Sequence, residues 1–336
     1  MSTTKFEHTH SAHCESGVIS TMLRHYGLNL SEPMVFGLAS ALSFAYLPFV
    51  KMGGMPLIAY RSLPKSIIKN MQKNLHVKMK LETFSSKEKG QERLDELLKE
   101  GKIVGAQSSV YWLPYFPEEM RFHFNAHNLL IFAKDGENYH ISDPVFEESV
   151  ICDKESLTKA RFTKGVMAPK GLLYYPTYVP TDIDLKPIIV KSIKRVAKLM
   201  LNTPVPIAGI RGMRHLAKNI SKLHKKDKRY AKLFLGHIVR MQEEIGTGGA
   251  GFRYLYASFL QEASLMFDND KRLQEASDML MSVGDEFREF ALMIAKSIKS
   301  KKEIDYKLLA DKLNSVADEE VKVYKKLLEF VQNIKL

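Results

Sequence analysis

The chain has 336 residues, a length sufficient for two domains. Of these residues 45% are hydrophobic and 26% charged, a composition ordinary for a globular protein. Its net charge is +12, and its two cysteines, Cys14 and Cys152, argue against a secreted disulfide framework and favour a reducing cytosol. No signal-peptide pattern opens the chain, and no stretch reaches the roughly 18 apolar residues that span a bilayer. We therefore expect a cytoplasmic protein without a transmembrane segment.

The first predicted element is a helix that begins at Cys14. Apolar residues recur from Val18 to Tyr26 at helical spacing, and Gly27 is a natural stop. The sulfur would then lie at a helix N-terminus, where unpaired backbone N–H groups and the helix dipole favour a thiolate. This placement is typical of a cysteine nucleophile, and the same N–H groups could stabilise an oxyanion.

Two other interpretations of this segment stay open. A lone cysteine is commonly an inert, buried small residue. The histidines that precede it, His8, His10 and His13, also suggest metal binding. Their spacing is not that of a zinc finger, however, and no second cysteine pair follows, so we expect no metal.

Residues 31–125 are predicted to mix short helices and strands. Ser31 caps a second helix, with Pro33 in its first turn, and the apolar stretch from Pro33 to Met52 reads as a buried helix or loop. The other elements expected here are helices at 64–74 and 91–99, strands at 56–60, 76–83 and 103–112, and a loop rich in aromatic residues and prolines at 113–125.

A β-hairpin is predicted over residues 126–144. The turn pair Asp135-Gly136 separates two runs of strand-forming residues. His127 opens the first strand and Asp143 closes the second, so pairing should make them neighbours. A histidine oriented by a carboxylate is the general base that a thiol nucleophile needs. The alternative is a packed histidine beside an ordinary Asp-Pro turn.

The remainder of the chain is predicted to be mainly helical. A helix at 154–164 and a strand at 171–175 come first, and prolines then mark a linker. The helices expected beyond it are 188–201, 205–224, 228–244, 252–267, 271–300 and 306–334. The predicted fold is α+β, with a first domain of residues 1–176 that holds an antiparallel sheet, a linker at 177–187 and an all-α domain at 188–336.

Positive charge is concentrated at the start of the helical part. Residues 186–245 contain 15 Lys and Arg against 3 Asp and Glu, a surplus equal to the net charge of the whole chain. A basic helical surface attracts an anionic partner, which could be a nucleic acid, an anionic membrane or an acidic protein. The alternative is a solvated face without a partner.

One glycine-rich motif follows, from Gly246 to Arg253. It matches G-x-G-x-x-G, but a helix rather than a strand precedes it, so a dinucleotide site is a poor interpretation. Because the motif opens a helix, Gly248, Gly249 and Arg253 are candidates to bind a phosphate. The alternative is a glycine turn that lets helices pack closely.

In chain order, Cys14, His127 and Asp143 resemble a papain-like site. More narrowly, the chain resembles the family of butirosin biosynthesis protein H, in which such a domain precedes a helical one. The resemblance covers nearly the whole chain. It is carried by His13-Cys14, the segment from Ser31-Glu32 to Phe36-Gly37, Ala126-His127, Ser142-Asp143-Pro144, Gly209 to Arg214, and Gly246 to Arg253.

The resemblance implies a cysteine acyltransferase, in which Cys14 is the nucleophile, His127 the base and Asp143 the residue that orients it. That family member moves an acyl group from an acyl-carrier-protein thioester to an amine of an aminoglycoside, so secondary-metabolite and antibiotic biosynthesis are implied. A papain-like site usually has a glutamine about six residues before the cysteine as an oxyanion donor. His8 occupies that spacing here, and His10 lies near it.

The implied partners are an acidic acyl carrier protein and a small-molecule amine, with no nucleic acid. The protein needs no cofactor of its own, because the substrate carries phosphopantetheine. The basic helices could dock the carrier, and Arg211, Arg214 or Arg253 could meet the phosphate. Two other functions stay open: a papain-like peptidase or amidase that uses the same three residues, and a non-catalytic module that binds an anionic surface.

Overall fold

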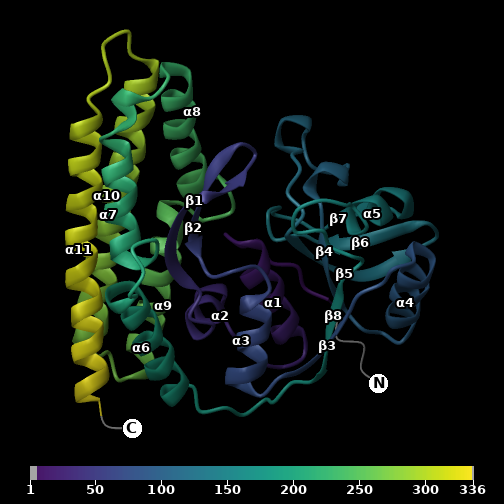
Figure 1. Ribbon diagram of the computed structural model, residues 1–336. Coiled ribbons are helices and arrows are strands. Elements are labelled where there is room, and N and C mark those ends of the chain that lie inside the picture. Colours follow the sequence, from purple (N-terminus) through teal and green to yellow (C-terminus); the bar gives the residue numbers. More distant parts are fainter. Residues whose placement is uncertain (1–5, 335–336) are drawn as a thin grey trace. The chain divides into compact units, whose positions relative to one another are not determined.

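The computed structural model describes residues 6–334, apart from the side chain of Met52, and the chain divides into two compact units (Figure 1). The first unit comprises the residues up to Val35 and Ile67–Ile183. The second comprises Phe36–Ser66 and Asp184–Leu336. No helix within residues 6–334 has both the length and the apolar character that a membrane-spanning segment requires.

The first unit is built on a six-stranded antiparallel sheet with the strand order β3-β8-β4-β5-β6-β7. The strands are β3 (Lys78–Glu82), β4 (Val104–Ser108), β5 (His127–Asp135), β6 (Asn138–Ser142), β7 (Val150–Asp153) and β8 (Leu173–Tyr178). The helices of this unit are α1 (Cys14–His25), α3 (Ser66–Leu75), α4 (Lys87–Lys99) and α5 (Lys154–Arg161), and α2 (Glu32–Leu38) spans the boundary between the units.

The side chains of strand β5 alternate between the two faces of this sheet, and the two faces are packed differently. Leu129 and Ile131 belong to a fully buried apolar core that α4 and α5 also line. Because side chains alternate along a strand, Asn128 and Leu130 point to the opposite face, where α1 packs. The face that carries Asn128 is therefore the one that meets the helix of Cys14.

The second unit is a helical body joined by a two-stranded hairpin. The hairpin pairs β1 (Leu42–Met52) with β2 (Met55–Arg61). Its helices are α6 (Lys186–Asn202), α7 (Gly209–Ile220), α8 (Lys228–Val239), α9 (Arg253–Met266), α10 (Lys271–Lys299) and α11 (Tyr306–Asn333). The two longest, α10 and α11, pack against each other, and α11 also contacts α6 and α7 (Figure 1). The predicted α+β class and helical C-terminal part are confirmed.

The prediction of a buried helix or loop over 33–52 is wrong in its second half. Helix α2 ends at Leu38, and Ser40 adopts a left-handed backbone with φ of 52°. In β1, the buried Leu42, Phe44 and Tyr46 alternate with partly exposed neighbours, which is the period of a strand. The predicted first domain, residues 1–176, also included this hairpin, whereas the structure groups residues 36–66 with the helices.

A buried ion pair holds the core of the second unit. The Arg253 guanidinium donates to both carboxylate oxygens of Glu320, at 2.8 and 3.1 Å, and both side chains are fully buried. The guanidinium also lies over the ring of Phe287, 4.6 Å from its centroid, and Tyr324 donates to Glu320 at 3.0 Å. Each charge is therefore compensated, as a charge away from water must be.

Removing one partner should destabilise this unit strongly. We expect Glu320→Ala to lower the free energy of unfolding by about 3–5 kcal/mol, because Arg253 would keep an uncompensated buried charge. The control is Glu319→Ala, which removes a half-exposed surface pair with Lys322 and should cost less than about 1 kcal/mol. Urea denaturation measures both. Equal losses in the two variants would contradict a stabilising role for the buried pair.

Candidate active site

Cys14 is the first residue of α1, and the segment before it is firmly held. His13 is the N-cap residue, and its Nδ1 accepts from the backbone N–H of Ser16 at 3.3 Å. The Glu32 carboxylate accepts from the backbone N–H groups of Ala12 and His13, both at 2.8 Å, and from the Ser16 hydroxyl. The sulfur is thus presented at a well-capped helix N-terminus, with Cys14 only 8% exposed.

A close approach brings α1 to the end of the β6 hairpin. A Cβ atom at Gly17 would lie 2.5 Å from the Cβ of Ser11 and 3.0 Å from that of Pro144, so only glycine fits there. The Ser11 N–H also donates to the Pro144 carbonyl at 2.8 Å. These contacts place the start of α1 beside the residue that precedes Pro144, which is Asp143.

The structure brings His127 and Asp143 together, as the hairpin pattern predicted. Nε2 of His127 lies 2.7 Å from Oδ2 of Asp143, and both side chains are buried. Strand β6 ends at Ser142, which pairs with Leu130, so Asp143 directly follows the last pair and His127 lies three residues before Leu130 on β5. The hairpin therefore brings the two residues to the same end of the paired strands, and the side-chain hydrogen bond joins them there.

Cys14 completes the constellation through a side-chain hydrogen bond with His127. Because Nε2 of His127 bonds Asp143, Nδ1 is the ring nitrogen that faces the Cys14 sulfur. Burial of the ring disfavours its charged form, but the Asp143 charge and hydrogen bond, aided by Cys14, outweigh burial and raise the pKa of His127 to about 10. A protonated imidazole beside a sulfur at a helix N-terminus favours an imidazolium–thiolate pair.

Two aromatic residues that the sequence analysis did not single out complete the surroundings. The Tyr115 hydroxyl donates to Oδ2 of Asp143 at 2.9 Å, and the ring of Phe116 meets the His127 ring edge-on, with centroids 5.6 Å apart. The Val145 N–H donates to the other oxygen, Oδ1, at 3.2 Å. The aromatic loop expected at 113–125 therefore packs on the triad, and its position directly before His127 was the available signal.

The three auxiliary histidines lie in separate places. Both ring nitrogens of His8 are engaged, one by the Ser142 hydroxyl at 2.7 Å and one by the Phe146 carbonyl at 2.9 Å. His10 is exposed and lies 3.7 Å from Glu147, while His13 caps α1. The structure therefore does not present His8 or His10 as an oxyanion donor. Within residues 6–334, no cluster of three or more His, Cys, Asp or Glu side chains has a metal-binding arrangement.

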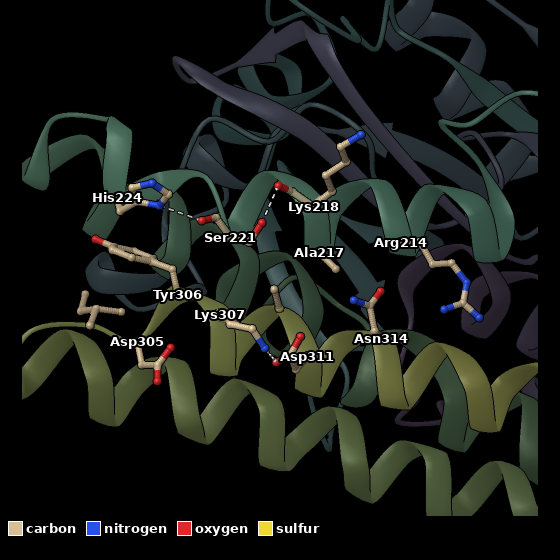
Figure 2. A pocket seen from close by; sticks show the side chains of 12 residues that line it. Arg214, Ala217, Lys218, Ser221, His224, Asp305, Tyr306, Lys307, Asp311 and Asn314 are labelled. Carbon is tan, nitrogen blue, oxygen red and sulfur yellow. Dashed lines mark hydrogen bonds and ion pairs between the residues drawn. The ribbon is translucent and has the colours of Figure 1, made fainter.

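The predicted phosphate ligands in the helical unit have different surroundings. The phosphate-binding role of Arg253 is wrong, because its guanidinium is buried against Glu320. Arg211 is exposed and donates to the Pro204 carbonyl at 3.1 Å. Arg214 pairs with Asp318 and lines a groove of about 590 Å³ between α7 and α11, shown in Figure 2.

The glycine motif is satisfied from within the chain. The Gly249 N–H donates to the Thr247 hydroxyl at 3.1 Å, and the next N–H, that of Ala250, donates to the Glu243 carboxylate. A carboxylate therefore occupies the place that a phosphate was predicted to take beside Gly248 and Gly249. A Cβ atom at Gly251 would lie 2.2 Å from the Tyr60 ring. These contacts favour the alternative interpretation, a glycine turn that permits close packing.

Two matches to family models accompany this geometry. The model described as butirosin biosynthesis protein H, N-terminal, matches residues 13–144, and the domain of unknown function DUF4872 matches residues 155–327. No curated protein matches the chain. Among solved structures, a C39-like peptidase candidate from Bacillus anthracis is similar, with 16% identity, 52% of this chain and 96% of that chain covered, and a TM-score of 0.37. Cys14, His127 and Asp143 all lie within the first matched stretch.

The raised pKa of His127 predicts a specific dependence of stability on pH. We compare Cys14→Ala with Cys14→Ala/Asp143→Asn, so that the thiol does not titrate. The Asp143 charge and hydrogen bond remain in the single variant and raise the folded-state pKa above the unfolded value of 6.5, although the contribution of Cys14 is lost. The stabilisation is therefore complete below about pH 6.5 and is lost as the pH rises through the folded-state pKa. We expect the single variant to lose up to about 1.4 kcal/mol of unfolding free energy per pH unit in this window.

The double variant should show little of this slope, because the charge that holds the proton on His127 is gone. Urea denaturation between pH 6 and 10 measures it. As a control, His10→Asn in the Cys14→Ala background should keep the slope, since the His10 ring is exposed and faces Glu147. An unchanged slope after Asp143→Asn would contradict control of His127 by this carboxylate.

Proposed function

Because the chain belongs to the DUF4872 family, with the N-terminal domain of butirosin biosynthesis protein H ahead of that domain, we propose that it is a cysteine acyltransferase of secondary metabolism. In this proposal it moves an acyl group from an acyl-carrier-protein thioester to an amine. The observation that carries the proposal is the convergence of Cys14, His127 and Asp143 in one buried site. The family matches and the site geometry support a cysteine-dependent enzyme, and we propose an acyl carrier protein as its donor and an amine as its acceptor.

The proposed reaction has two halves. The Cys14 thiolate attacks the thioester carbonyl, and the oxyanion forms beside the N-terminus of α1. The intermediate collapses with expulsion of the phosphopantetheine thiolate, which takes the proton from His127. The amine then attacks the acyl-cysteine, His127 accepts its proton, and the Cys14 thiolate leaves. Asp143 keeps the imidazole oriented and stabilises its charged form throughout.

The chemistry needs no bound cofactor beyond the phosphopantetheine that the substrate brings. Transfer of the acyl group from a thioester to an amine, which forms an amide, is energetically downhill. Besides the acyl group, only protons are transferred. The competing acceptor is water, and with water in place of the amine the same three residues perform the reaction of a peptidase or amidase. The two functions therefore share their first half and differ only in the acceptor.

The first half predicts a covalent intermediate. Incubation with an acylated carrier protein should add the acyl mass to the peptide that contains Cys14, and Cys14→Ala should take up none. Addition of a primary amine should then discharge the acyl-enzyme at least tenfold faster than buffer alone. Peptide mass spectrometry and the rate of carrier release measure these steps. Discharge at the same rate with and without amines would favour the hydrolase, and unimpaired turnover by Cys14→Ala would favour a non-catalytic role for this site.

The basic helices support the carrier as the acyl donor. Four cations of α6 share one exposed helical face: Lys191, Lys194, Arg195 and Lys198. None of them forms an ion pair with another residue in the described part of the chain. Cations without an ion-pair partner attract an acidic protein surface, and high salt screens this attraction.

Neutralising this face should weaken carrier recognition without affecting the chemistry. We expect the quadruple change of these α6 cations to Gln to raise the KM for an acylated carrier about tenfold at low salt, with kcat nearly unchanged. The KM for an acyl-pantetheine without the protein should not change. The matched control removes four other exposed cations of the same unit, Lys296, Lys299, Lys301 and Lys302. An equal rise in KM for both sets would show that the net charge of the protein, and not the α6 face, attracts the carrier.

A further inference from the structure

A buried amide lies under the sulfur of Cys14. Nδ2 of Asn128 is 3.9 Å from Sγ of Cys14, and the Asn128 side chain is only 2% exposed. Asn128 follows His127 on β5 and points to the face on which α1 packs, whereas His127 reaches the sulfur from the end of the strand. The sulfur is therefore contacted by an imidazole at the strand end and by an amide from the sheet face.

Three hydrogen bonds set the orientation of this amide. Oδ1 of Asn128 accepts from the Tyr174 hydroxyl at 3.0 Å, and Nδ2 donates to the Ala126 carbonyl at 3.1 Å. The second Nδ2 hydrogen is the one directed at Sγ of Cys14. A flipped amide would place its oxygen against both the carbonyl and the sulfur, two acceptors. The network therefore holds an N–H group, not an oxygen, towards the cysteine.

The fold makes specific room for the tyrosine that sets this orientation. Tyr174 on β8 is the cross-strand partner of Gly105 on β4, and a Cβ atom at Gly105 would lie 2.1 Å from the Tyr174 ring. Burial, with the charges of Glu15 and Cys14, raises the pKa of Tyr174 well above its ordinary value. The hydroxyl therefore stays protonated and remains a donor to Asn128 over the whole working range.

We propose that Asn128 is the sheet-side hydrogen-bond donor to the Cys14 thiolate, and that Tyr174 is the positioning residue that keeps its N–H on the sulfur. The inference rests on Cys14 being the nucleophile of the proposed function. A hydrogen bond to an ionised acceptor is stronger than one to its neutral form, so this N–H favours the thiolate over the thiol. With the α1 N-terminus and His127, it is a third group that stabilises the charged sulfur.

The test is the pH dependence of Cys14 alkylation by iodoacetamide in the full chain, followed by peptide mass spectrometry. Asn128→Leu keeps the side-chain volume and removes the N–H donor. The midpoint of its alkylation pH profile should rise by about 0.5–1 pH unit. Tyr174→Phe should raise the midpoint by a smaller amount, because the amide remains but is free to turn. Cys152 is an inert reference in the same digest, because burial raises the pKa of its thiol to about 12.

The matched control is Gln107→Leu. Gln107 is the cross-strand partner of Asn128, shares its face of the sheet and is equally buried, so its replacement disturbs the same packing. Its midpoint should stay within about 0.2 pH unit of wild type. Equal shifts in Gln107→Leu and Asn128→Leu, or no shift in Asn128→Leu, would overturn the proposal. Should Asn128→Leu fail to fold, an unshifted Tyr174→Phe would overturn it.

Alkylation reports on the sulfur and not on acyl transfer, so the two proposals fail separately. A normal set of midpoint shifts with no acyl mass on Cys14 from any carrier thioester would reject the proposed function and leave this inference standing. Acyl-enzyme formation with unshifted midpoints would reject this inference and leave the proposed function standing.

Discussion

The hydrogen bond between Asp143 and His127 is the contact on which the geometry and charge of this site depend. Both groups are buried, and a buried charge persists only where an opposite charge or a hydrogen bond compensates it. The carboxylate provides both for the imidazole, and Tyr115 and Val145 provide donors for the carboxylate. The ring is consequently held in one orientation, with its other nitrogen directed to Cys14, and it stays protonated where a free histidine would not.

Placing a sulfur beside this pair is a problem of helix packing. Helix α1 presents Cys14 at its N-terminus only because the capped segment before it is tied to the Pro144 carbonyl and because Gly17 lets the helix approach closely. Asn128 and Tyr174 then contact the site from the sheet face that α1 covers. The position of the sulfur therefore depends on contacts from the helix, the hairpin and β8 together, and none of these elements could position it alone.

The accuracy of the sequence predictions follows the range of the interactions involved. The pairing of His127 with Asp143 was predictable because a tight hairpin joins them and strand register is local. The prediction of a buried helix or loop is wrong for the strand at residues 42–52, because a short apolar run suits either structure until its packing partner is known. His8 was assigned by spacing alone, and its ring is used instead by Ser142 and Phe146.

By itself, the sequence determined the α+β class with its helical C-terminal part, the helix that starts at Cys14 and the hairpin that unites the imidazole with the carboxylate. These features depend on composition, periodicity and turn chemistry, which act over a few residues. Only the tertiary structure decided that Arg253 is a buried partner of Glu320 and not a phosphate ligand, and that Asn128 lies under the sulfur. Burial and contact across a sheet are properties of the packed chain, because residues that lie far apart in sequence create both.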